Sequence, residues 1–198
     1  MSLDKTKLKT LLVKACKDPS IAVPPNPSDA PYPSSEDDAR TRWSKAVADY
    51  LKDAKVSGPP TVAPTDSQMS FSGVQDAIKD ALAFPTEGSV NAAAETTAKA
   101  WKAGIDAITL SASGFYDAPV NINPIVAIDA LSPSGQVSTL ESELITIFST
   151  FGNATTIEGQ MELIANAIDT ATNIAFITTC TIQPPVGSPV PGNTLIFG

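Results

Sequence analysis

Apolar residues recur along this chain at the spacing of one face of a helix. The first such stretch, residues 3–17, has an apolar face made of Leu8, Leu11, Leu12, Ala15 and Cys16. Five later stretches have the same period: 35–54, 72–84, 89–108, 138–151 and 155–168. The pattern predicts a mainly α fold with about six amphipathic helices.

Polar residues mark the starts of several of these helices. Ser72, Ser138 and Thr155 each stand three residues before a Gln or Glu, which is the spacing of a capping box. Phe84-Pro85 and Gly152-Asn153 supply stops. We therefore expect three helices to begin at these caps.

Two stretches depart from the helical period. Ile125–Ile128 predicts a short strand, and the run IAFITTCTI at 174–182 has the β-branched content and alternation of another. This run either forms a strand throughout or begins as a continuation of the preceding helix. We expect one or two short strands in all.

Seventeen prolines divide the chain with extended connections. The expected organisation is an N-terminal helix (1–19), a Pro-rich strap (20–34), a helical body (35–182) and an extended C-terminal tail (183–198). A Pro-rich strap is either a flexible linker or an extended segment that lies across a neighbouring surface. Apolar residues in the strap and tail favour the second alternative. The candidate partner-binding residues are Ile21, Val23, Tyr32, Leu195, Ile196 and Phe197. Trp43 is a further candidate, although an aromatic residue on a helical stripe is more often core.

Residues 72–120 and 138–186 follow one plan of helix, break, helix and apolar run. Each second helix carries an Ile-Asp pair, Ile105-Asp106 or Ile168-Asp169. Two interpretations remain open: an internal duplication, or two amphipathic hairpins that look alike.

Charge is distributed unevenly along the 198 residues, whose net charge is −8. Residues 1–102 hold all thirteen basic residues, which fall between Lys5 and Lys102, and thirteen of the twenty-one acidic ones. Residues 103–198 therefore hold eight acids and no base. A phosphate-binding surface needs Lys or Arg, so we expect no nucleic-acid partner for this half. The lysines before it are explained by solvated helix faces.

Candidate chemistry is scarce. The chain has no histidine, no Gly-rich phosphate loop and no nucleophile elbow, and its two cysteines, Cys16 and Cys180, have apolar neighbours typical of buried thiols rather than of a disulfide. Asp106 and Asp169 are the one conceivable carboxylate pair, but helix-edge carboxylates are far commoner. We expect no catalytic residue, cofactor or metal site, and hence no enzyme.

The N-terminus is amphipathic and lacks the apolar core of a signal peptide, and the apolar runs are too short to cross a bilayer. No membrane partner is expected. The sequence therefore indicates a protein made and kept in a cytoplasm, or built into something assembled there.

Three segments carry a resemblance to a known class: ARTRWSKAVADYLKDAKV, AAAETTAKAWKAGIDAITLS, and MELIANAIDTATNIAFITT followed by the Pro/Gly tail. These segments are similar in sequence character to small structural proteins of tailed-phage particles. The resemblance implies a virion component of the tail, baseplate or neck, assembled in the host cytoplasm. Its partners would be other structural proteins and copies of itself.

The leading hypothesis is therefore a non-enzymatic structural subunit of a multi-protein assembly. Three alternatives stay open: a soluble binding or chaperone-like assembly adaptor, a capsid-surface accessory protein, and an uncharacterised hydrolase that uses Asp106 and Asp169.

Overall fold

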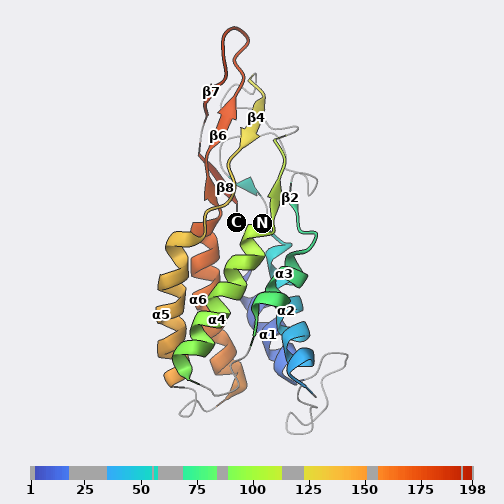
Figure 1. The fold of residues 1–198 in the computed structure, drawn as a ribbon, viewed down its shortest axis with the longest axis vertical. Coiled ribbons are helices and arrows are strands. Elements are labelled where there is room, and N and C mark those ends of the chain that lie inside the picture. The colour runs from blue at the N-terminus through green and yellow to red at the C-terminus, as the bar shows by residue number, and fades with distance from the viewer. Residues whose placement is uncertain are drawn as a thin grey trace.

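The fold is given by a computed structural model (Figure 1), which describes residues 3–17, 35–54, 56–57, 69–83, 89–112, 123–150, 156–192 and 194–197. Six helices lie in these ranges: α1 (Lys5–Lys17), α2 (Glu36–Leu51), α3 (Val74–Ala81), α4 (Val90–Asp106), α5 (Ser134–Ser149) and α6 (Ile157–Ala175). The mainly α fold predicted from the periodicity is confirmed.

The helices form a closed bundle. Each packs against the helices before and after it in the sequence, and α1 also packs against α6. The largest side chains that are buried completely are Trp101, Tyr50, Phe176, Leu8, Leu12, Leu51, Ile78, Leu82, Ile105 and Leu140. Contact between α3 and α4 is especially close, since a Cβ on Gly104 would lie 2.6 Å from Ile78 Cγ1. The apolar stripes of the sequence therefore face one shared core.

Helix starts agree only partly with the predicted caps. Thr156, one residue after the predicted Thr155, is the N-cap of α6, and its hydroxyl accepts a hydrogen bond from the backbone N–H of Gly159 at 3.1 Å. The cap predicted at Ser138 is wrong: α5 begins a turn earlier, at Ser134, after Pro133, whose fixed φ suits the entry to a helix. The N-cap of α3 is Gly73 with φ 81°, not Ser72.

Eight strands of two to four residues lie in the described ranges, more than the one or two expected. They are β1 (Val56–Ser57), β2 (Met69–Ser70), β3 (Thr109–Leu110), β4 (Ile125–Ile128), β5 (Ile177–Thr178), β6 (Cys180–Ile182), β7 (Val190–Pro191) and β8 (Leu195–Phe197). All pairings are antiparallel, in sheets of order β1-β8-β5, β2-β3 and β4-β6-β7. The strand predicted at Ile125–Ile128 is confirmed. The run at 174–182 does begin as a continuation of α6.

The molecule is elongated, with the helical bundle at one end (Figure 1). The sheet of β4, β6 and β7 projects away from the bundle at the other end, and the loop of residues 183–189 joins β6 to β7 at its far tip. We call this sheet and its loop the arm. This shape bears on function, because it separates the tip of the arm from the helices of its own chain.

The segment predicted as an extended tail is largely paired with the rest of the chain. Residues 190–191 form the outer strand β7 of the arm. Residues 195–197 form β8, which lies between β1 and β5. Phe197 pairs with Val56, and Leu195 pairs with Thr178. Both backbone edges of β8 are therefore occupied within the chain.

The two regions that follow one plan in sequence differ in detail. α3 has 8 residues, whereas α5 has 16. β3 pairs with β2, whereas β6 pairs with β4 and β7. They share an order of helix, helix and strand, and an internal duplication stays a prediction.

Candidate functional site

The arm is built by pairing residues far apart in sequence. β4 meets β6 with Ile128 opposite Cys180 and Ile125 opposite Ile182, and the register shifts between Ile125 and Ala127. Hydrogen bonds extend the pairing at both ends: the N–H of Asp129 donates to the carbonyl of Thr179, and that of Gln183 donates to the carbonyl of Pro124, each at 3.0 Å. The arm is thus held mainly by backbone contacts.

Close packing fixes the outer strand of the arm. The N–H of Gly192 donates to the carbonyl of Cys180 at 2.8 Å. A Cβ on Gly192 would lie 2.7 Å from both Cys180 Sγ and Ile182 Cγ2, so only glycine fits there. Burial raises the pKa of the Cys180 thiol, and the negative charge of Asp129 raises it further. Cys180 is therefore a buried packing residue rather than a reactive one.

The tip of the arm exposes apolar groups and no charge. The side-chain amide of Gln183 donates to the carbonyls of Pro184, at 3.1 Å, and Gly187, at 3.0 Å. These bonds hold the loop, and Val186 at its end is 90% exposed. Residues 170–198 contain no charged side chain. Exposed apolar surface without charge is typical of a protein–protein contact.

A second candidate surface, with a single charged residue in its lining, lies between α5 and α6. Two adjoining hollows of about 300 and 80 Å³ share Glu143, Ala167 and Thr170 in their walls. Leu163 and Ile174, at the two ends, are 47% and 50% exposed. Glu143 is the only charged residue in the lining of either hollow. We call this surface the α5–α6 groove.

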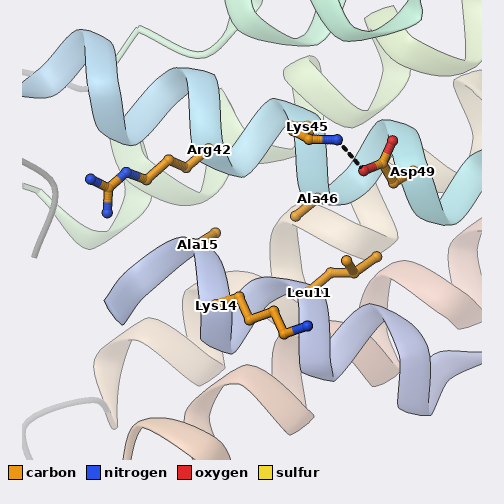
Figure 2. Close-up of a pocket in the computed structure, with 7 residues that line it drawn as sticks. All are labelled: Leu11, Lys14, Ala15, Arg42, Lys45, Ala46 and Asp49. Carbon is orange, nitrogen blue, oxygen red and sulfur yellow. Dashed lines mark hydrogen bonds and ion pairs between the residues drawn. The ribbon is translucent and has the colours of Figure 1, made fainter. Parts of the chain in front are cut away.

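A third hollow, of about 120 Å³, lies between α1 and α2 (Figure 2). Its basic residues are Lys14, Arg42 and Lys45. Arg42 pairs with Asp38 at 2.6 Å, and Lys45 pairs with Asp49 at 2.6 Å. Burial alone would raise the pKa of Asp49, but its hydrogen bonds with lysines lower it. Two of the three positive charges are thus offset within the chain, which makes this hollow a weak candidate for an anion site.

The sequence-predicted carboxylate pair is not built as a unit. Asp106 forms an ion pair with Lys102 on α4. Asp169 on α6 accepts hydrogen bonds from the Tyr50 hydroxyl at 2.5 Å and from the Asn173 amide at 3.1 Å. The two carboxylates therefore have separate partners, and the arrangement suggests helix packing rather than acid–base work.

Tyr50 and Trp101 each donate a side-chain hydrogen bond to a residue of α6. Burial raises the pKa of Tyr50 well above 10.0, and the hydrogen bond to Asp169 raises it further. The indole N–H of Trp101 donates to the Thr172 hydroxyl at 3.0 Å, and this hydroxyl donates to the carbonyl of Ile168 at 2.6 Å. These bonds tie α2 and α4 to α6.

The partner-binding candidates have different outcomes. Ile21, Val23 and Tyr32 lie outside the described residues. Trp43 is half-buried and packs against the core, as an aromatic residue on a helical stripe should. Leu195, Ile196 and Phe197 form β8, whose backbone is paired within the chain. A contact between these seven residues and a partner stays a prediction.

Cys16 and Cys180 are not joined by a disulfide, as expected. Cys180 is buried, whereas Cys16 is half-buried. Among the described residues, no group of three acids or cysteines has the arrangement of a metal site. None of the described helices is long and apolar enough to span a bilayer.

No protein-family model, curated protein or solved structure matches this chain. Its function is therefore inferred from its own residues and shape.

Sequence reasoning missed both the arm tip and the α5–α6 groove. The tip falls in the run QPPVGSPVP, whose prolines predicted only an extended tail. Leu163 lies off the face of α6 that buries Met161, Ile164 and Ile168, and an extra apolar residue on a helix is the signal for a second contact surface. Ile174 was assigned to the apolar run at 174–182, so its exposure on α6 could not be seen from the predicted helix.

Proposed function

We propose that this protein is a non-enzymatic structural subunit of a multi-protein assembly, and that the assembly is a tailed-phage virion, with the subunit in its tail, baseplate or neck. The observation that carries the proposal is the arm. It projects from a helical bundle, carries no charge and ends in an exposed valine. A monomer gains nothing from such an arm, whereas a subunit gains a point of attachment.

The charge pattern supports the same function. The α5–α6 side of the bundle is acidic, and the groove along it is nearly uncharged. The nearly neutral tip and groove suit contacts with other proteins, because docking them desolvates few charges. The resemblance of three sequence segments to small tailed-phage structural proteins supplies the type of assembly.

The test must shorten the arm without removing β8. Deleting all of residues 183–198 would take out the strand between β1 and β5, so a failure would report misfolding. Ile182 and Val190 are paired directly, so Asn-Gly in place of residues 183–189 closes the hairpin with a two-residue turn. This variant keeps the bundle and β8 intact.

The shortened protein replaces the normal one during particle formation, and mass spectrometry measures both proteins in purified particles. We expect the normal protein to be present and the shortened one to be depleted at least about tenfold, given the loss of a buried valine contact. Absence of the normal protein from finished particles would favour the transient adaptor and overturn the proposal. Undiminished incorporation of the shortened form would show that the loop at the tip of the arm is not needed for incorporation.

A further inference from the structure

We propose that the arm tip of one copy docks into the α5–α6 groove of a second copy. This inference rests on the proposed function, because it names the first contact by which such a subunit would assemble. It identifies both sides of the contact on the same chain. Each molecule would then carry both the loop that inserts and the groove that receives it.

The two surfaces share the same chemistry. Val186, flanked by prolines and glycine, presents a small apolar projection on a loop already held by Gln183. The groove offers the apolar side chains of Ile147, Leu163 and Ile174 between threonine hydroxyls. A pre-ordered loop loses little conformational entropy on docking, which favours binding.

Gln136 adds a polar reason for an occupant. It lines the end of the groove, and its Oε1 atom is buried with no hydrogen-bond partner among the described residues. Buried acceptors in folded proteins are nearly always satisfied. A docked loop that turns the Gln136 side chain outward can donate to this oxygen from the N–H of Gly187 or the hydroxyl of Ser188.

Charge does not oppose the docking of the tip of a second copy. α5 and α6 carry Glu141, Glu143, Glu158, Glu162 and Asp169 and no base, so another part of the acidic half would be repelled. Residues 170–198 are uncharged, so the tip approaches without that repulsion. Because Glu143 is the only charge in the groove lining, a basic segment would lose hydration there for a single ion pair.

The geometry makes the contact intermolecular. The tip lies at the end of the molecule opposite the helices, so it cannot enter its own groove (Figure 1). The tip and the groove are different surfaces, so the contact either forms twice in a two-fold dimer, with each tip in the other groove, or propagates head to tail into a ring or a filament. A ring or stack of copies fits a subunit of a tail or neck.

Cross-linking between two proteins that each carry one accessible cysteine tests the contact. One protein carries Val186→Cys at the tip, and the other carries Thr170→Cys in the groove. Both carry Cys16→Ala, while Cys180 stays because it is buried with a raised pKa. A short bis-maleimide linker should join the two proteins only when they are mixed. Cross-linking of the Val186→Cys protein with itself, or none in the mixture, would overturn the proposal.

Sedimentation velocity over a concentration series supplies a second measurement. The unmodified protein should form concentration-dependent oligomers, and Val186→Asp should weaken association at least about tenfold through lost burial and repulsion by Glu143. Val126→Asp, at a half-exposed position on β4 away from the tip, is the matched control and should change association less than about twofold. A strictly monomeric protein, or equal effects of the two variants, would refute the contact.

The outcomes separate this inference from the proposed function. If purified particles contain the protein but no cross-link joins tip and groove, the subunit role stands and the second-copy contact is wrong. If the cross-link forms but particles lack the protein, self-association stands and the virion role is wrong. A basic partner protein that binds the groove in place of the tip would also refute the contact.

Discussion

Among the residues that the structure describes, Trp101 in the bundle and Val186 in the arm lie at the two extremes of burial for large apolar side chains. Trp101 is completely buried and hydrogen-bonded to Thr172, whereas Val186 is 90% exposed. The bundle places its apolar residues against one another, and the arm presents one of its own to the surroundings. This contrast separates the part of the chain that folds the protein from the part available to bind.

The forces in the two regions differ accordingly. Burial stabilises the bundle, at about 25 cal/mol for each Å² of apolar surface removed from water. The arm is held by backbone hydrogen bonds between short strands and by a few contacts around Cys180. Sheets this small have marginal stability by themselves. We therefore expect damage to the bundle to unfold the arm, and damage to the arm to leave the bundle folded.

The largest expected effect comes from Trp101→Ala. The substitution leaves a cavity in the core and removes the hydrogen bond to Thr172. The free energy of unfolding should fall by about 3–5 kcal/mol. Chemical denaturation followed by circular dichroism measures this loss, and hydrogen exchange should show arm amides losing protection together with the helices.

Trp101→Phe is the control for this variant, because it keeps most of the ring volume and loses the indole N–H. Its cost should be clearly smaller than that of Trp101→Ala. Equal costs would assign the stabilisation to the hydrogen bond rather than to packing. Arm amides that kept full protection in Trp101→Ala would contradict the dependence of the arm on the bundle.

Tyr50→Phe should have the next largest effect. It removes a hydrogen bond to the Asp169 carboxylate, and bonds to charged groups contribute about 1.5–3 kcal/mol. The pKa of Tyr50 is raised in the folded state, so its contribution is complete below pH 10, the pKa of an unfolded tyrosine. Above pH 10 the unfolded state ionises first, and folding stability falls by about 1.4 kcal/mol per pH unit.

Chemical denaturation of both proteins between pH 8 and 11 measures this dependence. The difference in stability between unmodified protein and variant should be constant up to about pH 9.5 and narrow above pH 10. Lysines and the other tyrosines are common to both proteins and cancel in the comparison. A difference that widened above pH 10 would contradict the raised pKa.

Two Gly→Ala variants give the smallest effects and compare the regions directly. A Cβ on Gly104 would meet Ile78 of α3 at 2.6 Å, and one on Gly192 would meet Cys180 and Ile182 at 2.7 Å. Gly104→Ala should cost about 1–3 kcal/mol of global stability, since the buried Ile78 cannot move away freely. Gly192→Ala should change global stability by less than about 0.5 kcal/mol but separate β7 from β6.

Hydrogen exchange resolved by residue distinguishes these results. In Gly192→Ala, the amide of residue 192 should lose protection while helix amides keep theirs. Gly135→Ala on α5 is the control for both, because a Cβ there has no neighbour within 4 Å, and it should leave stability unchanged or raise it by up to about 1 kcal/mol. Global unfolding of Gly192→Ala would show that the arm and the bundle form one cooperative unit.

The helices were predictable because their signal is local. An apolar stripe with a period of 3.6 residues needs only its own segment to be recognised, and Leu8, Leu12 and Ile105 are buried as the stripes require. The errors were in the predicted starts of helices, because residues of the preceding turn also decide where a helix begins. Pro133 starts α5 before Ser138, and Ser138 instead accepts a hydrogen bond at its carbonyl from the Ser142 hydroxyl.

The strands and the candidate site were mostly not predictable, because their partners lie far away in sequence. Two or three residues, such as Val56-Ser57 or Val190-Pro191, carry no recognisable alternation. Ile125–Ile128 was found because four apolar residues follow Pro124 without a helical period. The tail was predicted as extended, which its prolines require, but only the pairing of Phe197 with Val56 shows where it goes.

The central position of β8 has a consequence for synthesis. Helices α2 to α6 can each pack on the helix before them as the chain leaves the ribosome, but β1 must wait for residues 195–197. At about 5–20 residues per second, that interval is on the order of 7–30 s. During it the edge of β1 that will receive β8 lacks this partner. A ribosome that pauses in this interval prolongs the time in which a neighbouring chain can take the place of β8.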